Sequence, residues 1–409
     1  MGRAEPPEQD KPPGPLGTCA ASEVVAEMTR WQRGAMNIAP SGEVPLLSEL
    51  DRLTGDAVRR EMVPGIAVAV VDGDQVVGAA AAGTADLADA ARMTVAGAAN
   101  WFSMTKIATA TAAVMLGEQG SLDLDAPVAR YLGGSWPAAF SGVRVQHLLS
   151  HSSGLRNPVP IRWVHRAGDP RPEPAAFLAR QLARQKRPRF APGSRAAYNN
   201  IGYLALGQVI AAASGVPYET FVREQLLIPL GMTRTAFSWT DPALSGSPRV
   251  TGYQRLRRPL TPLLAAYLPH GILGRRTGRY VALEAFDLDG AAYGGLIGPV
   301  TDVARLVALH ANRGSAGGLR LLRPGWVEAM SDISTVGRPY DFGLGWFRPF
   351  HDEQGVWQFG GGMGYWNLLR LHPRDGYGAA VMSNTTHRWD IITFADAAID
   401  VTVGAGSRR

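Results

Sequence analysis

Cysteine and lysine are scarce in this 409-residue sequence, which contains one cysteine, Cys19, and three lysines, Lys11, Lys106 and Lys186. A single cysteine excludes an internal disulfide and any metal or iron–sulfur site built from several thiolates. Arginine supplies nearly all of the 41 basic residues. Arginine keeps its charge in proteins, whereas a lysine can lose its proton where its pKa is lowered. The lysines are therefore the first residues to consider for acid–base chemistry.

A membrane-length apolar run is also missing. The longest stretch without a charged residue, Ala196 to Tyr218, has polar residues and a proline within it, and its apolar residues recur at helical spacing. This pattern predicts a buried helix. The charged, proline-rich N-terminus lacks the apolar core of a secretory signal. We therefore expect a cytoplasmic protein without integral membrane association and with a disordered arm over residues 1–40.

Two groups of motifs are missing as well. No G-x-S-x-G sequence occurs, which argues against the triad of α/β-hydrolases. No Walker A sequence occurs, and no G-x-G-x-x-G follows a predicted strand, which argues against nucleotide binding. No motif of a nucleic-acid-binding domain is present either, so we expect no nucleic-acid partner.

The remaining composition, with 46% apolar and 19% charged residues, is typical of a folded globular chain. Helical spacing predicts helices from about Leu46 to Met62 and from about Trp389 to Val403. Short apolar runs predict two strands around a turn at 72–74 and four more in the segments FGLGWF, VWQFGGG, NLLRLHP and YGAAVMSN. We predict an α/β (α+β) fold in which residues 41–100 and 300–409 build an antiparallel sheet flanked by helices. Residues 101–299 are predicted to form an inserted, mainly helical domain.

Two segments concentrate positive charge. Residues 156–189 carry a net charge of +7, and residues 255–279 carry +6 with no acidic residue. Such segments are either solvated loops or an electropositive rim that attracts an anionic substrate, an acidic carrier protein or a membrane surface. The second segment encloses an apolar stretch, 259–273, which suggests a lid or one wall of an acyl pocket. We hypothesise that this segment selects anionic or carrier-linked acyl substrates.

The spacing Ser103-x-x-Lys106 is the first sign of catalysis. A long Ala/Thr/Val-rich run follows the lysine, which predicts a buried helix that starts near Ser103. Residues three apart lie on one helical face, so Ser103 and Lys106 are predicted to face each other. Burial and the positive end of the helix dipole push a lysine toward its neutral form. A neutral amine can then take the proton of the serine, which is a weak nucleophile without such a partner.

Two further motifs support this interpretation. Tyr198-Asn199-Asn200 lies between a turn and the predicted buried helix, where Tyr198 can relay a proton and Asn200 can hydrogen-bond a substrate carbonyl. A second Tyr-x-Asn sequence, 365–367, lies inside a predicted strand, and we interpret it as structural. The glycine-rich stretch from Gln358 to Gly364 leaves backbone N–H groups free to stabilise an oxyanion.

From about residue 45 to residue 400, the sequence resembles the serine β-lactamase-like and penicillin-binding-protein-like hydrolases, especially class C β-lactamases and related carboxylesterases. The resemblance rests on the three motifs and on segments in family order, namely VPGIAVAVV, GSLDLDAPVARYL, VQHLLSHSSGL, FAPGSRAAYNNIGYLALGQVI, IPLGMTRTAF, GGLIGPVTDVARL, FGLGWF and VMSNTT. It implies a β-lactamase/transpeptidase-like fold. It also implies Ser103 as the acylated nucleophile, Lys106 as its base, Tyr198 as second base or proton relay, and Asn200 as a substrate-positioning residue. The oxyanion hole would combine the Ser103 N–H with one N–H after the third motif.

The third motif departs from the family. Lactamases and D,D-peptidases usually carry Lys or His, then Thr or Ser, then Gly. Here the ungapped register gives Gln358-Phe359-Gly360, with Gly361 supplying the N–H. A shift by one gives Phe359-Gly360-Gly361, with Gly362 supplying it, and resembles the Trp-Gly-Gly of the esterases. Neither register places a cation or a hydroxyl where penicillins and peptides carry a carboxylate, which favours an ester or another neutral acyl substrate. The alternative is that the arginine-rich loops bind the carboxylate by another route.

Several alternatives remain at this level. His147 and His151, four residues apart, could lie on one helical face as metal ligands, but no H-E-x-x-H motif completes the pair, so we predict no metal and no cofactor. The leading function is a carboxylesterase-like serine hydrolase that forms an acyl-enzyme with a small-molecule acyl substrate. It is followed by an acyltransferase or thioesterase that uses a carrier-bound acyl group, and then by a β-lactamase or D,D-peptidase. A non-catalytic binding protein on the same fold is the alternative of another class.

Overall fold

The computed structural model describes residues 43–160, 162–257, 259, 261–349, 352 and 354–406. The predicted disordered arm, 1–40, lies outside these residues. Everything described belongs to one compact unit.

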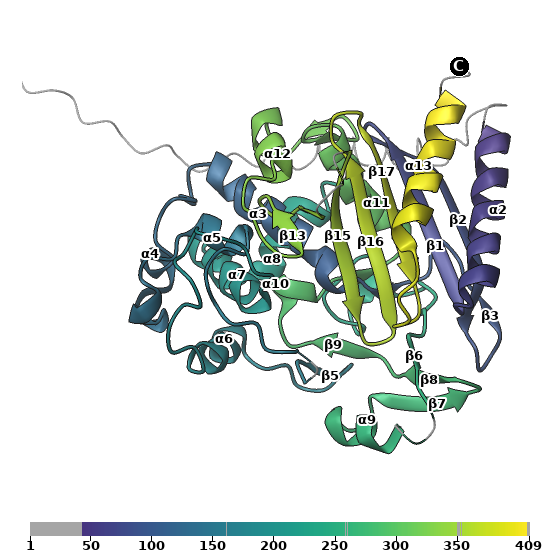
Figure 1. Cartoon of the computed structure of the whole chain (residues 1–409), viewed down its shortest axis with the longest axis horizontal. Coiled ribbons are helices and arrows are strands. Elements are labelled where there is room, and N and C mark those ends of the chain that lie inside the picture. Colours follow the sequence, from purple (N-terminus) through teal and green to yellow (C-terminus); the bar gives the residue numbers. More distant parts are fainter. Residues whose placement is uncertain are drawn as a thin grey trace, which may run out of the picture. The chain divides into compact units, whose positions relative to one another are not determined.

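An eight-stranded antiparallel sheet forms the centre of this unit, in the order β13-β14-β15-β16-β17-β1-β2-β3 (Figure 1). Strand β1 lies between β17 and β2, so the two ends of the sequence meet in the middle of the sheet, with Val68 opposite Val381 and Ala80. The strands of this sheet are β1 (Gly65–Asp72), β2 (Gln75–Asp86), β3 (Ala91–Arg92), β13 (Tyr340–Phe342), β14 (Phe347–Pro349), β15 (Val356–Gly362), β16 (Tyr365–His372) and β17 (Tyr377–Ser383).

Helices cover both faces of the sheet. Along β1, alternate side chains enter different cores, because successive residues of a strand point to opposite faces. Ile66, Val68 and Val70 pack with α2 (Glu43–Glu61) and α13 (Ile391–Gly406), which lie side by side at one edge of Figure 1. Ala67, Ala69 and Val71 join the larger core on the other face, where α11 (Val300–Ala311) contacts β1 and β17.

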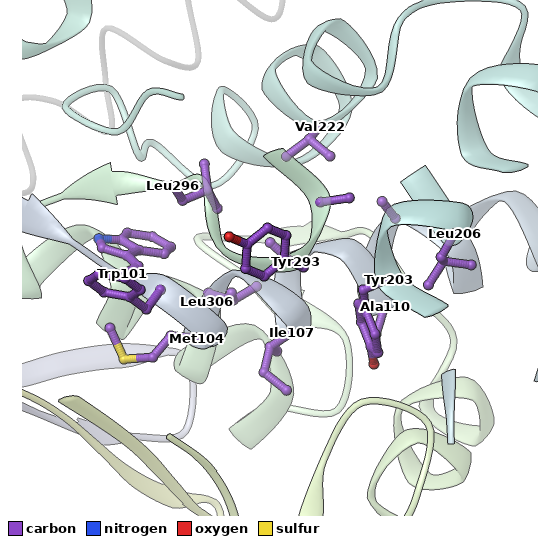
Figure 2. Close-up of a cluster of buried hydrophobic side chains, with 14 of the residues drawn as sticks. Trp101, Met104, Ile107, Ala110, Tyr203, Leu206, Val222, Tyr293, Leu296 and Leu306 are labelled. Carbon is purple, nitrogen blue, oxygen red and sulfur yellow. The ribbon is translucent and has the colours of Figure 1, made fainter. Parts of the chain in front are cut away.

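The larger core surrounds α3 (Thr105–Glu118), a helix whose residues from Thr105 to Leu116 are all buried. Figure 2 shows Met104 and Ile107 on this part of the chain, together with Trp101, Tyr203 and Tyr293. Tyr203 comes from α7 (Asn200–Ser214), the buried helix that the uncharged stretch predicts. The core therefore brings the helix that follows the Ser-x-x-Lys motif against the helix that follows the Tyr-x-Asn motif.

The segment 101–299 contains short strands as well as helices. Within it, β6 pairs with β8, β8 with β7, and β5 with β9, while β10 pairs with β4, which lies just before the segment. The remaining helices are α4 (Ala129–Leu132), α5 (Val145–Leu149), α6 (Pro174–Leu182), α8 (Tyr218–Val222), α9 (Thr261–Tyr267), α10 (Ala291–Gly294) and α12 (Pro324–Ser331). The remaining strands are β4 (Ala99–Asn100), β5 (Val164–Arg166), β6 (Tyr253–Arg255), β7 (Leu273–Thr277), β8 (Tyr280–Leu283), β9 (Phe286–Leu288), β10 (Ile297–Gly298), β11 (Ser315–Ala316) and β12 (Leu319–Arg320). The division into a sheet domain and an inserted domain stays a prediction.

Most predicted elements of the sheet region are confirmed, and one is wrong. Helices α2 and α13 and strands β1, β2, β15, β16 and β17 lie where the patterns place them. FGLGWF is not a strand, because it holds the end of β13, a turn and the start of β14. Gly345 in this turn has φ +106°, and a Cβ there would lie 2.7 Å from the Ala110 side chain on α3. The apolar residues of the segment therefore mark a buried corner against α3.

Among the described residues, no single helix is long and apolar enough to cross a membrane. Helix α7 and the stretch Tyr218–Leu227 pass that test only as a pair, and the pair is bent by 77°.

Candidate active site

Ser103 lies in a short 3₁₀ turn, η1 (Phe102–Met104), that leads directly into α3. The turn is anchored from behind, since the Trp101 N–H donates to the Leu296 carbonyl at 2.9 Å and the indole N–H of Trp101 donates to the Gly298 carbonyl at 3.1 Å. Phe102 has φ +50°, an unusual conformation for a residue with a side chain. This backbone holds Ser103 half-buried at the first turn of the helix, where amide N–H groups lack carbonyl partners within the helix.

Lys106 is fully buried, and its amine contacts three oxygens. Nζ lies 2.7 Å from the Tyr293 carbonyl, 2.9 Å from Oδ1 of Asn200 and 3.0 Å from Oγ of Ser103. The two carbonyl oxygens only accept hydrogen bonds. A neutral amine that donates to both has used its two hydrogens, so its lone pair is left for the Ser103 hydroxyl. This arrangement is that of a general base.

The surroundings of Lys106 favour the neutral amine. Burial holds the pKa of Lys106 well below its usual range. The other close groups are aromatic rings, with Nζ 4.9 Å from the ring centroid of Tyr198, 5.3 Å from that of Tyr203 and 5.4 Å from that of Tyr293. These rings stabilise an ammonium less than a carboxylate would. The cost of burying the charge therefore determines the direction of the pKa shift of Lys106.

Tyr198 completes the contacts of the serine, because its hydroxyl donates to Ser103 Oγ at 2.5 Å. The loop that carries Tyr198 ends at Asn199, which caps α7 by accepting from the Gly202 N–H at 2.8 Å. Burial raises the pKa of the Tyr198 phenol, and hydrogen bonds to Ser103 and Gln358 oppose that shift. The phenol therefore stays protonated and can donate a proton.

Asn200 lies in the same cluster, although it faces the base. It is buried, its Oδ1 accepts from Lys106, and its N–H donates to Asn157 Oδ1 at 2.9 Å. A contact between Asn200 and substrate stays a prediction, whereas its contact with Lys106 indicates that it orients the base.

Strand β15 carries the third motif past Ser103. Gln358, Gly360 and Gly362 point toward η1: the Gln358 amide donates to the Ser103 carbonyl at 2.8 Å, and Cβ atoms on the two glycines would lie 2.2 Å from the Trp101 carbonyl and 2.0 Å from the Phe102 ring. The Phe359 side chain is on the opposite face of the sheet, stacked on Trp366 with ring centroids 4.9 Å apart. Only the backbone of Phe359 is therefore near the serine.

Backbone direction distinguishes the two registers of this motif. The N–H and C=O of one residue in an antiparallel strand point to the same side, and the side alternates along the strand. The Trp366 carbonyl on β16 points toward β17, where it accepts from the Ser383 hydroxyl at 2.6 Å. Gly361 lies opposite Trp366, so the backbone groups of this pair point away from each other. The Gly361 N–H therefore points away from β16, to the same side of β15 as the Phe359 carbonyl, which the Gln358 amide contacts at 3.3 Å. The structure thus favours the ungapped register, with Gly361 as the N–H donor and Gly362 paired to β16.

Three groups of the site were not assigned a role from sequence. The Gln358 side chain belongs to the third motif, but the sequence does not predict its contact with the Ser103 carbonyl. The Tyr293 carbonyl belongs to α10 and gives no signal in the sequence, because any residue carries a carbonyl. From the sequence, His151 is only a possible metal ligand.

The two histidines do not form a metal pair in the structure. Helix α5 ends at Leu149, and His151 lies beyond it with φ +56°. His147 Nδ1 accepts from the Arg144 N–H, and His151 Nδ1 accepts from the Asn199 N–H at 3.0 Å. Burial lowers the pKa of His151, whose ring packs 4.7 Å from the Tyr198 ring. His151 therefore supports the loop that positions Tyr198.

Comparison with known proteins identifies the family of the chain. The model of the family described as Beta-lactamase matches residues 50–400. The chain belongs to the beta-lactamase family. It is a serine hydrolase of the acyl-enzyme type that acts on small-molecule acyl substrates, as the sequence predicts.

Two curated relatives and one solved structure illustrate the range of this family. The chain is 27% identical to the D-alanyl-D-alanine-carboxypeptidase/endopeptidase AmpH of Escherichia coli K12, over 68% of this chain and 69% of AmpH. It is 30% identical to esterase EstB of Burkholderia gladioli, over 66% of this chain and 71% of EstB. Its fold is similar to that of EstCE1, a hydrolase with promiscuous acyltransferase activity, with a TM-score of 0.66, 21% identity, and coverage of 88% of this chain and 98% of EstCE1. The predicted β-lactamase/transpeptidase-like fold is confirmed.

Proposed function

We propose that this member of the beta-lactamase family is a carboxylesterase-like hydrolase that prefers neutral esters to β-lactams and D-alanyl peptides. The observation that carries the proposal is Gln358, a neutral amide on β15 whose Nε2 lies 2.8 Å from the Ser103 carbonyl. In the ungapped register, lactamases and D,D-peptidases have Lys or His at this position. A charge-assisted hydrogen bond to a substrate carboxylate is worth about 1.5 to 3 kcal/mol, and Gln358 cannot supply the charge.

The proposed reaction follows from the contacts of Ser103. The neutral Lys106 amine takes the hydroxyl proton as Ser103 Oγ attacks the ester carbonyl, and the N–H groups of Ser103 and Gly361 stabilise the oxyanion. Tyr198 donates its proton to the departing alkoxide and recovers one from the Lys106 ammonium. Water then attacks the acyl-enzyme, which releases the carboxylic acid and restores the serine.

The acyl-enzyme intermediate could also transfer its acyl group to an acceptor other than water. An alcohol or amine in place of water would make the reaction an acyl transfer, the activity that the description of EstCE1 names beside hydrolysis. A carrier-bound donor and the cytoplasmic location stay predictions. An alcohol added to the ester assay would distinguish the two outcomes, because acyl transfer forms a new ester whereas hydrolysis forms only the carboxylic acid.

The first test combines p-nitrophenyl esters of short and long acyl chains, a chromogenic cephalosporin and a fluorophosphonate probe. We expect burst release of nitrophenol, one label per chain by whole-protein mass spectrometry, and little cephalosporin turnover. Ser103→Ala should lose label and turnover while keeping the melting temperature of the wild type. Cephalosporin turnover equal to that of the esters would contradict the proposed preference, and an unlabelled wild-type chain would contradict Ser103 as nucleophile.

A gain of function tests Gln358 directly. Gln358→Lys should raise kcat/KM for the cephalosporin about tenfold or more relative to the ester, because it supplies a charged donor for the substrate carboxylate. Gln75→Lys adds the same charge at the exposed β1–β2 turn and should leave the ratio unchanged. An unchanged ratio in a folded Gln358→Lys variant would show that the neutral amide does not set the preference.

A further inference from the structure

A basic surface pocket of about 450 Å³ lies beyond the end of the β15–β16 hairpin. Arg255, Arg257, Arg279 and His387 line it, together with Gln254 and Thr386, and no carboxylate is among the described lining residues. The arginines come from β6, from the segment after β6 and from the β7–β8 turn. The pocket is thus where part of the basic 255–279 segment comes together.

The arginines of this pocket are available to a ligand. Arg255 and Arg257 are exposed, and within the described part of the chain neither makes an ion pair with a carboxylate. Arg279 donates to the Met62 carbonyl at 3.4 Å and lies over the Tyr280 ring, which leaves its charge uncompensated. Three permanent charges around one hollow repel one another, and a bound anion would relieve that repulsion.

The pocket is joined to the strand that carries the proposed oxyanion donor. The Thr386 hydroxyl accepts from the Gly364 N–H at 2.8 Å and donates to Gln254 Oε1 at 2.8 Å. Gly364 and Gly362 belong to the same hairpin, and Gly362 packs against Phe102, the neighbour of Ser103. The wall of the pocket is therefore continuous with the strand that passes the serine.

Tyr198 and the pocket lie toward opposite ends of this strand. Tyr198, which is proposed to protonate the leaving group, contacts Ser103, and so does Gln358, which lies on the N-terminal side of Gly361. The pocket lies past Gly362, on the C-terminal side. If the leaving group departs toward Tyr198, the acyl group extends the other way, past Gly362 and the turn at 363–364, where the three residues from Gly361 to Gly364 span at most about 10 Å.

We infer that this pocket binds a carboxylate at the far end of the acyl group. This rests on the proposed esterase function and specifies its substrate class as monoesters of dicarboxylic acids. An acyl chain of about six to eight carbons spans the distance from Gly361 to the pocket. Water releases the dicarboxylic acid from Ser103, and the alcohol has left in the first step.

The test compares p-nitrophenyl monoesters of adipic and suberic acid with their methyl-capped counterparts, which have the same length and no charge. The wild type should prefer the charged ester at low ionic strength, and added salt should reduce that preference. The double variant Arg255→Gln/Arg257→Gln should lower the charged-to-neutral ratio of kcat/KM by about 10- to 100-fold. Arg275→Gln is the matched control, because it removes an exposed arginine of the same segment that does not line the pocket.

The outcomes separate this inference from the proposed function. If the wild type hydrolyses both esters equally, or if the double variant keeps the wild-type ratio, the inference is wrong and the esterase proposal stands. An equal loss of the ratio in Arg275→Gln would assign the preference to the general positive potential of the segment and overturn a localised site. If neither ester is hydrolysed although Ser103 is labelled, the esterase proposal itself fails.

Discussion

Lys106 shows how one buried side chain acquires its chemistry. The carbonyls of Tyr293 and Asn200 take the two hydrogens of a neutral amine, and the serine hydroxyl occupies the remaining direction. Burial lowers the pKa of Lys106 and raises that of Tyr198, so both groups are neutral when substrate arrives. In the proposed reaction, Lys106 is the base that accepts the serine proton and Tyr198 is the acid that protonates the leaving group.

This pair predicts an acid limb in the pH profile. Because protonation of Lys106 removes the base, kcat/KM should fall as the pH drops through the lowered pKa of Lys106. Lys106→Arg stays charged at every accessible pH and should lose about 100- to 10,000-fold in kcat/KM. Ester hydrolysis measured across the pH range checks both, and an arginine variant with wild-type activity would exclude Lys106 as the base.

The same pKa predicts how stability changes with pH. Between the lowered folded value and the ordinary value of the unfolded chain, the unfolded state binds more protons, so the contribution of Lys106 to stability rises with pH. Lys106→Met removes this dependence. The stability of the wild type relative to the variant, from urea midpoints, should increase from about pH 6 to about pH 9, and a constant difference would contradict a neutral Lys106.

At the scale of elements, the approach of β15 to η1 forms the site. A Cβ at Gly360 would lie 2.2 Å from the Trp101 carbonyl, which is backbone and cannot rotate away. The strand can therefore pass the serine closely enough to offer the Gly361 N–H only because residue 360 has no side chain. Glycine at position 360 is therefore required for β15 to approach η1, which is a different role from that of a glycine in a turn.

Gly360→Ala should therefore move β15 away from η1. We expect a loss of about 1 to 3 kcal/mol of stability and a larger relative loss of kcat, because the oxyanion donor moves with the strand. Gly325→Ala, on the exposed side of α12 where a new Cβ meets nothing within 4 Å, is the control and should keep wild-type stability and activity. Thermal unfolding and ester kinetics test the pair, and wild-type kcat in Gly360→Ala would contradict the proposed oxyanion hole.

For the whole molecule, the sheet is assembled from sequence segments some 300 residues apart, since Ile66 pairs with Ser383 in its centre. The intervening chain delivers Ser103 from η1, Tyr198 from the loop before α7 and the Tyr293 carbonyl from α10, while β15 returns to supply the backbone donor. The site is a product of this long-range closure, and its basic pocket comes from a third part of the chain, 254–279 with 386–387.

The sequence by itself determined the fold class, most strands of the sheet as short apolar runs, and the side chains Ser103, Lys106 and Tyr198, because apolar runs, helical spacing and residue chemistry are local properties. Only the tertiary structure decided which N–H groups of the glycine-rich strand point away from β16, that Gln358 contacts Ser103 and the Tyr293 carbonyl contacts Lys106, and that FGLGWF is a corner. It also selected which arginines share a pocket. These features depend on strand register and on contacts between distant segments, which no local pattern of residues specifies.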